Sequence, residues 1–330
     1  MVISSNLLKA LESFPIPIKH VLRAQDFNRE MILALFQLAD ILEKGPMPFD
    51  IMNGRALVWF GNEASSRTFF SFSRAALDLG GGVMPLFSEF SSQKKGEVLG
   101  DTIVTLSTIG PEDIIVLRHP DEDAISRAAL VSKVPVINAG SGKEQHPTQA
   151  LLDAYTIFKT LGRLDDFSIA LVGDLKYGRT TNSLSYLLTK FTGIKLYLVS
   201  RDALRMKGEL RYYLHKHEVD QGCIKVVETS DFQWVVDKVD IIYQTRAQKE
   251  RSTDAEHGEH EQNPPYIIDR AVAERMKEGA RIMHPWPRND ELSREIDYMP
   301  QELYIEQMYF GRLIRRALLA IICHHNPISR

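Results

Sequence analysis

Hydroxyl and guanidinium groups gather in one short segment of the chain, Ser65-Ser66-Arg67-Thr68, directly after an apolar run that is typical of a strand. A helical pattern follows, so the segment would lie at a helix N-terminus, where N–H groups and the helix dipole favour anions. Serine and threonine hydroxyls together with an arginine could complete a phosphate site. The alternative is an ordinary serine N-cap beside a surface arginine, and the spacing alone leaves both open.

Two further polar groups follow predicted strands in the first half of the chain. Arg118 ends one apolar run, and His146 stands immediately before Pro147, which suits the first turn of a helix. A helix N-terminus lowers the basicity of an imidazole and favours a neutral ring that donates a hydrogen bond. A capping histidine with no further role is the alternative.

The second half repeats this theme. Lys176 and Arg179 share the glycine-containing turn 173–180, and Arg246 and Gln248 alternate after another strand, so their side chains would face the same way. Cationic side chains on two such loops suit a carboxylate ligand, although plain connecting loops are the alternative. Prolines flank Trp286 in His284-Pro285-Trp286-Pro287 and make a rigid loop whose carbonyls could accept hydrogen bonds, or a surface turn.

These side chains need a scaffold, and apolar, β-branched runs predict it. Nine runs indicate buried strands: Ala56–Phe60, Gly82–Leu86, Asp113–Leu117, Val134–Asn138, Ser168–Val172, Lys195–Val199, Ile224–Val227, Ile241–Gln244 and Arg281–His284. Most are separated by segments with helical period. Alternation of strand and helix predicts an α/β fold with parallel sheets flanked by helices, and places sites at the carboxyl ends of the strands.

Four strands precede residue 140 and five follow residue 165, which predicts two domains. The first comprises 1–149 with a C-terminal helix in 301–330, and the second comprises 150–300. The helical stretch Pro147–Leu161 should bridge the domains, with the C-terminal helix packing back across it. The polar stretch Lys249–Pro265 is long for a compact domain and predicts a mobile functional loop.

Composition excludes several classes of protein. The 330 residues carry a formal charge of −3 and are 44% apolar, which is typical of a globular protein rather than a dedicated nucleic-acid binder. Cys223 and Cys323 are the only cysteines and form no CxxC pair, so a disulfide framework or a secreted protein is not expected. Neither a signal peptide nor a membrane span is apparent, and we expect a cytoplasmic location.

Seven motifs, which occur in order over nearly the whole chain, resemble the aspartate/ornithine carbamoyltransferase family, and most closely its aspartate-specific catalytic chains. They are EASSRT (63–68), KKGE (94–97), LRHP (117–120), EQHPTQALLD (144–153), GDLKYGRT (173–180), TRAQKER (245–251) and HPWPRNDE (284–291). Together the motifs are highly specific. The resemblance implies transfer of a carbamoyl group from carbamoyl phosphate to L-aspartate, giving N-carbamoyl-L-aspartate and phosphate in de novo pyrimidine biosynthesis.

The resemblance also implies roles for individual residues. Ser65, Ser66, Arg67 and Thr68 would bind the phosphate of carbamoyl phosphate, while Thr68, Arg118 and His146 would polarise its carbonyl oxygen. Gln149 and the backbone carbonyls of Trp286 and Pro287 would hold the carbamoyl amide. Arg179, Arg246 and Gln248 would bind the aspartate carboxylates. Ser91 and Lys95 would reach a neighbouring subunit's site, which implies a homotrimer with shared active sites. No metal or cofactor is expected, and a regulatory chain is left open.

Two departures from the family pattern keep alternatives open. Phe69 stands where the family usually has a second arginine, and Trp286 stands where aspartate-type enzymes usually have leucine. Either backbone carbonyls act at 286 and the ring is tolerated, or the ring fills the amine pocket. The rivals are a carbamoyltransferase for another amine, such as ornithine, and a catalytically silent homologue that acts as a binding subunit. A metal hydrolase is disfavoured, because the paired histidines lie in polar segments: His215 and His217, His257 and His260, and His324 and His325.

Overall fold

The chain divides into two compact units in a computed structural model that describes residues 4–46, 48–248 and 265–328. The first unit is Met1–Leu152 with Tyr309–Arg330, and the second is Asp153–Met308. The divisions fall inside helices α6 (Pro147–Leu161) and α12 (Tyr304–His325), so each of these helices belongs partly to both units. The predicted loop 249–265 lies, except for Pro265, outside the described residues.

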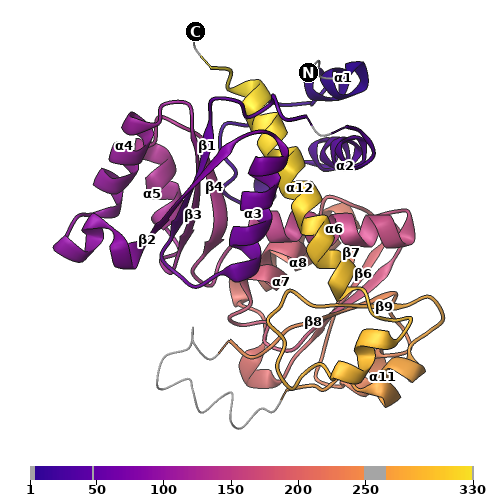
Figure 1. The fold of residues 1–330 in the computed structure, drawn as a ribbon. Coiled ribbons are helices and arrows are strands. Elements are labelled where there is room, and N and C mark those ends of the chain that lie inside the picture. The colour runs from indigo at the N-terminus through magenta and orange to yellow at the C-terminus, as the bar shows by residue number, and fades with distance from the viewer. Residues whose placement is uncertain (1–3, 47, 249–264, 329–330) are drawn as a thin grey trace. The chain divides into compact units, whose positions relative to one another are not determined.

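The first unit is built on a parallel sheet with the strand order β2-β1-β3-β4 (Figure 1). Its strands are β1 (Ala56–Gly61), β2 (Gly82–Phe87), β3 (Ile114–His119) and β4 (Val136–Ser141). Its helical segments are α1 (Ser5–Glu12), η1 (Ala24–Asp26), α2 (Arg29–Lys44), α3 (Ser66–Asp78), η2 (Ser88–Phe90), η3 (Ser92–Lys95), α4 (Leu99–Ile109) and α5 (Ala124–Val131). Parallel pairing of all four strands confirms the expected α/β architecture.

Helices cover both faces of this sheet. Figure 1 shows α4 and α5 on one face and α3 on the other. Alternate side chains of a strand face opposite sides, so Val58 and Phe60 of β1 join Ile103 of α4 and Ile125 of α5 in one buried cluster. Burial of both faces accounts for the continuous apolar runs that predict the strands.

One strand of this sheet differs from the expectation of burial. In β2 four of six residues are exposed, including Met84 and Phe87. The prediction of a buried strand is wrong here, because β2 is at the edge of the sheet and, among the described residues, pairs with β1 alone. Pro85 is compatible with this edge position, since proline cannot donate to a second ladder.

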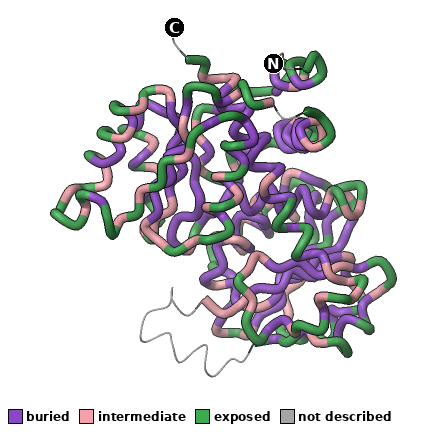
Figure 2. The backbone as a smooth tube through the Cα atoms, in the orientation of Figure 1, coloured by how far each residue is buried: buried purple, intermediate pink, exposed green. Residues whose placement is uncertain are grey.

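The second unit contains a parallel sheet of five strands, in the order β7-β6-β5-β8-β9. They are β5 (Ser168–Val172), β6 (Ile194–Val199), β7 (Ile224–Thr229), β8 (Ile241–Gln244) and β9 (Arg281–Met283). The helical segments are α7 (Arg179–Leu188), η4 (Asp202–Leu204), α8 (Gly208–Gln221), α9 (Phe232–Val235), α11 (Arg270–Arg275) and η6 (Arg294–Tyr298). Figure 2 shows that most strands of this unit are buried. The prediction of a buried strand is wrong for β7, which lies at the edge of the described sheet and buries Ile224 while its other residues stay partly or fully exposed.

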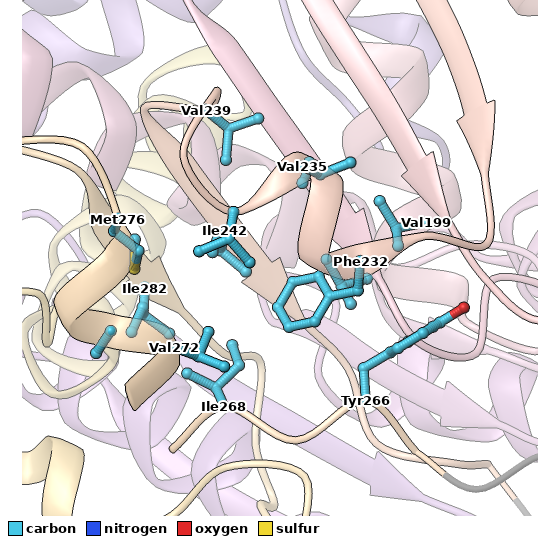
Figure 3. Packing of buried hydrophobic residues seen from close by; sticks show 14 of the residues in the cluster. Val199, Phe232, Val235, Val239, Ile242, Tyr266, Ile268, Val272, Met276 and Ile282 are labelled. Carbon is cyan, nitrogen blue, oxygen red and sulfur yellow. The ribbon is translucent and has the colours of Figure 1, made fainter. Parts of the chain in front are cut away.

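An apolar cluster packs against this second sheet (Figure 3). Phe232 of α9, Val272 of α11 and Ile242 of β8 meet there with Tyr266 and Ile268, which lie outside the strands. Removal of such apolar surface from water is the main force that holds an α/β layer together. Among the described residues, no helix combines the length and the apolar character needed to cross a membrane.

A buried carboxylate joins α3 to α12 within the first unit. Asp78 is 1% exposed, and its oxygens lie 2.9 Å from Arg74 Nε and 2.7 Å from Arg312 Nε. Arg316, also buried, has Nη1 3.9 Å from the same carboxylate. A buried charge must be compensated, so this one carboxylate balances several guanidinium groups and fixes the C-terminal end of α3.

We expect Asp78→Asn to lower the free energy of unfolding by about 3–5 kcal/mol, because the buried guanidinium of Arg316 and the partly buried guanidinium of Arg312 lose their counter-charge. Urea denaturation at neutral pH would measure the change. Glu89→Gln, the same charge change at an exposed position, should have an effect within about 0.5 kcal/mol. Equal midpoints for the Asp78 variant and the wild type would contradict this role.

Candidate active site

Three loops of the first unit emerge at one edge of its sheet. In the register, Gly61 at the end of β1 pairs with Arg118 of β3, and His119 pairs with Ser141 at the end of β4. The Asn62 N–H donates to the Arg118 carbonyl at 2.9 Å. Segments far apart in sequence therefore begin side by side at the carboxyl ends of parallel strands, where such sheets bind ligands.

The segment Ser65-Ser66-Arg67-Thr68, called here the anion cradle, begins α3. Ser65 is the N-cap with extended backbone, but its hydroxyl makes no capping hydrogen bond. This disfavours the alternative of an ordinary serine cap. Thr68 is buried, whereas Ser66 and Arg67 are exposed. The N-terminal turn thus presents a guanidinium, hydroxyls and the positive end of the helix dipole.

Arg118 is held in place by groups of the neighbouring strand β4 and of the loop that follows β1. Its Nη1 donates to the Ala139 carbonyl at 3.2 Å, and its Nε lies 3.3 Å from the carboxylate of Glu63. The Arg118 side chain is only 12% exposed. A partly buried guanidinium with fixed partners is well suited to stabilise developing negative charge, because it need not reorganise. Sequence reasoning gave Glu63 no role.

His146 is buried and directly precedes α6. Its backbone carbonyl accepts from the N–H groups of Gln149 and Ala150, and Thr148 Oγ1 lies 3.5 Å from its Nδ1. Gln149, one turn into the helix, is also buried. The predicted position of His146 at a helix N-terminus is therefore correct, and this position favours the neutral ring.

Ser91 and Lys95 flank the short helix η3. Ser91 caps it, accepting from Gln93 N–H at 3.3 Å, and Lys95 is exposed at its end. Gln93 also accepts from the Asn62 amide at 2.9 Å, which fastens η3 beside the end of β1.

Phe69, in place of an arginine, packs its ring with Trp59 and Phe87.

In the second unit, Asp174 joins two loops. One carboxylate oxygen accepts from Tyr177 N–H at 3.0 Å, and the other accepts from Gln248 N–H at 2.9 Å. Gly173, with φ 114°, permits the close approach, because a Cβ there would lie 2.5 Å from the Thr245 carbonyl oxygen. The buried Asp174 thereby ties the loop that leads to Arg179 to the loop that carries Arg246.

The link through Asp174 helps to place the three residues that are predicted to bind the carboxylates of the substrate. Arg179 is the first residue of α7 and is buried. Arg246 and Gln248 are partly exposed, and Arg246 Nη1 donates to the Ala247 carbonyl at 2.7 Å. Two guanidinium groups and an amide thus follow the neighbouring strands β5 and β8.

The loop 284–287 follows β9, and its tryptophan ring faces the core of the unit. Trp286 Nε1 donates to the Tyr304 carbonyl at 3.3 Å, and the two rings meet edge to face at 5.8 Å. The ring also packs against the apolar cluster of Figure 3. Of the two alternatives, this placement favours tolerance of the ring, while Pro287 is exposed.

An ion pair between Arg288 and Asp297 lies beside the Trp286 ring. Arg288 lies over the Trp286 ring at 5.1 Å, and it donates through both terminal nitrogens to Asp297, one at 2.6 Å. Tyr304 Oη donates to the same carboxylate at 2.5 Å. The hydrogen bonds from Arg288, with help from Tyr304 and against the effect of burial, hold the pKa of Asp297 below its ordinary value.

Several groups that organise the site were missed from the sequence. Asp174 follows a strand-ending glycine, which is a local signal that could have found it. Asp153 and Gln307 lie in long helices with no such signal, and they matter through contacts with residues distant in sequence.

No described cluster of three or more His, Cys, Asp or Glu side chains is arranged to hold a metal ion. His215 lies in α8 with Nδ1 3.2 Å from Glu218, and His324 and His325 end α12. His257 and His260 lie outside the described residues.

Two family models match the chain. Residues 19–159 match the carbamoyl-P binding domain of aspartate/ornithine carbamoyltransferases, and residues 165–322 match the Asp/Orn binding domain of the same family. The chain is 42% identical to chloroplastic aspartate carbamoyltransferase of Arabidopsis thaliana, over 92% of this chain and 77% of the relative. It is 41% identical to the aspartate carbamoyltransferase catalytic subunit of Thermococcus onnurineus, over 92% and 96%.

Solved structures of aspartate transcarbamoylase from Trypanosoma cruzi share the fold. The complex with carbamoyl phosphate has a TM-score of 0.88 at 39% identity, covering 94% of this chain and 98% of that one. The complex with N-(phosphonacetyl)-L-aspartic acid has a TM-score of 0.87 at 39% identity, covering 94% and 99%. Similarity over both units confirms the predicted fold class.

The lowered pKa of Asp297 predicts how its contribution to stability depends on pH. The contribution should be present above the ordinary carboxyl pKa and should be lost as pH falls through the lower value of the folded state. We expect Asp297→Asn to lower the free energy of unfolding by about 1–3 kcal/mol at pH 7, with a smaller difference from wild type at pH 3. Urea denaturation at both values tests this, with exposed Asp220→Asn as the control. A difference that grows on acidification would refute it.

Proposed function

The chain belongs to the aspartate/ornithine carbamoyltransferase family, and we propose that it transfers the carbamoyl group of carbamoyl phosphate to the amine of L-aspartate. The products are N-carbamoyl-L-aspartate and phosphate. One observation carries the proposal: the anion cradle, Arg118 and His146 lie at or after the carboxyl ends of three strands, β1, β3 and β4, of one parallel sheet. The named relatives and the ligands of the Trypanosoma cruzi structures support the choice of substrates.

In this proposal the first unit binds carbamoyl phosphate. The anion cradle receives the phosphate, with Ser65, Ser66, Arg67 and Thr68 as its ligands. Thr68, Arg118 and His146 polarise the carbonyl oxygen. Gln149 and the backbone carbonyls of Trp286 and Pro287 accept hydrogen bonds from the carbamoyl amide. The exposed residues of the cradle bind the phosphate, and the partly buried Arg118 stabilises the negative charge that develops on the carbonyl oxygen.

The second unit binds the amine substrate. Arg179, Arg246 and Gln248 hold the two carboxylates of aspartate on the loops that Asp174 joins. A cationic pair of this kind suits a dicarboxylate, whereas ornithine has a second ammonium group that two guanidinium groups would repel. We therefore favour aspartate over ornithine.

Catalysis is mostly a matter of positioning and charge stabilisation. The uncharged amine attacks the carbamoyl carbon and a tetrahedral oxyanion develops. Arg118, Thr68 and neutral His146 stabilise that oxyanion, and the bond to phosphate then breaks. The departing phosphate takes the proton of the amine, and no protein base is assigned.

The active assembly in this proposal is a homotrimer in the cytoplasm that serves pyrimidine biosynthesis. Ser91, the buried N-cap of η3, and Lys95, the exposed last residue of η3, would complete the site of a neighbouring subunit. A regulatory chain remains a further candidate partner. The plant relatives are named chloroplastic, so targeting is a separate question for each member of the family.

The decisive test is phosphate release from carbamoyl phosphate by the purified protein, with L-aspartate and L-ornithine offered in parallel. We expect activity with aspartate alone. Arg118→Ala should lower kcat by at least about a hundredfold, because the developing oxyanion loses its guanidinium. Arg127→Ala, the same change at an exposed arginine of α5, should leave kcat within about twofold. Silence with both amines in a folded protein would favour the silent binding subunit instead.

Shared sites predict complementation between inactive variants. Lys95→Ala and Arg118→Ala should each be nearly inactive alone. After they are mixed, dissociated and reassembled, activity should reappear, because some hybrid sites combine the intact Lys95 of one subunit with the intact Arg118 of another. Sedimentation should give about three times the 37.5 kDa chain mass. Activity that stays absent in a mixture of proven hybrids would argue that each site uses one chain only.

A further inference from the structure

A buried histidine lies at the start of the loop that carries Trp286 and Pro287. His284 is 1% exposed, and its Nδ1 lies 2.9 Å from the Trp286 backbone nitrogen, which donates to it. The other ring nitrogen, Nε2, lies 2.9 Å from Glu291 Oε1. Since Nδ1 accepts a hydrogen bond, the proton of the neutral ring is on Nε2, which donates to Glu291.

Glu291 closes the loop from its other end. The same Oε1 accepts from Asn289 N–H at 2.9 Å, so one buried carboxylate contacts both the imidazole and the backbone that follows Pro287. Burial alone would raise the pKa of Glu291, but the hydrogen bonds from His284 and Asn289 outweigh it and lower the pKa. The carboxylate is therefore ionised and acts as an acceptor at neutral pH.

The backbone between these two residues needs such support. Trp286 has φ 56°, in the left-handed region that non-glycine residues seldom adopt. A conformation of this kind persists only where the surroundings impose it. The hydrogen bond from Trp286 N–H to His284 supports this conformation directly, and the hydrogen bond from its indole to Tyr304 fixes the side chain.

The histidine is itself anchored to the strand that leads to Arg246. Its backbone N–H donates to Gln307 Oε1 at 2.9 Å, and Gln307 Nε2 donates to Asp153 at 2.6 Å. Tyr243 Oη, on β8, donates to the other oxygen of this fully buried carboxylate at 2.7 Å. One network thus spans β8, α6, α12 and the loop after β9, all within the second unit.

We propose that His284, with its tautomer fixed by Glu291, is a positioning residue that holds the backbone carbonyls of Trp286 and Pro287 where the carbamoyl amide binds. The inference rests on the proposed function and deepens that function by naming the residue that orients these backbone carbonyls. His284 exchanges no proton with substrate, because both of its nitrogens are engaged within the loop.

Two isosteric substitutions separate the two ring nitrogens. In His284→Asn the side-chain oxygen replaces Nδ1 and can still accept from Trp286. In His284→Gln the side-chain amide replaces Nε2 and can still donate to Glu291, but the acceptor for Trp286 is lost. Isothermal titration would measure binding of phosphonoacetamide, which carries the amide, and of inorganic phosphate, which does not.

We expect His284→Gln to weaken phosphonoacetamide binding at least about tenfold, the effect of one lost hydrogen bond. His284→Asn should stay within about threefold of wild type, and phosphate binding should change less than about twofold in both. Near-ultraviolet circular dichroism would confirm that both variants fold. If His284→Gln does not fold, the pair Glu291→Leu and Glu291→Gln replaces it: the leucine should lose amide binding and the glutamine, still an acceptor, should keep it.

The outcomes separate this inference from the function on which it rests. If wild type fails to bind phosphonoacetamide, the proposed function falls and this inference falls with it. If wild type binds and the folded variants bind equally well, the positioning role alone is overturned. Equal weakening of amide and phosphate binding would also overturn it, because a general structural defect would then explain the loss.

Discussion

Parallel strand pairing is the constraint on which both halves of the proposed site depend. All strands of a parallel sheet end at the same edge, so the loops that follow them begin as neighbours whatever their separation in sequence. In the first unit this brings Arg118 beside Gly61, the residue that precedes the loop of the anion cradle. In the second unit it brings the loop after Val172 beside the loop after Gln244. Each sheet therefore brings together polar groups that lie far apart in the sequence.

The register of the strands brings the loops together but does not orient their side chains and backbone groups. Buried carboxylates provide that orientation. Asp174 accepts hydrogen bonds from the backbone of two loops, and Glu291 accepts from a backbone N–H and an imidazole. Asp153 accepts from one side chain of α12 and one side chain of β8. Burying a carboxylate costs free energy unless hydrogen-bond donors surround it. A change in the backbone geometry that removed these donors would therefore be unfavourable. Loops built in this way can present backbone groups as reliably as side chains, which preorganised catalysis requires.

The sequence predicts the scaffold better than the supporting contacts. Each of the nine apolar runs overlaps a strand, because burial on both faces leaves a continuous local signal in most of them. The same signal overestimates burial for the edge strands β2 and β7, since strand propensity cannot tell an edge from a centre. His146 is predictable from Pro147, but Gln307 is not: its partner Asp153 is more than 150 positions away, and only the fold brings them together. Tertiary hydrogen bonds of this kind have no periodicity to detect.

The two departures from the family pattern become intelligible when backbone and side-chain roles are separated. At position 286 the proposed acceptor is a carbonyl, so the identity of the side chain is decided by what it packs against, and Tyr304 and Arg288 accommodate an indole. Phe69 likewise faces Trp59 and Phe87, one position after the last residue of the cradle. Both substitutions therefore fall where packing sets the requirement. A substitution at Arg118 or His284 would differ in kind, because there the side-chain atoms themselves make the contacts that fix the site.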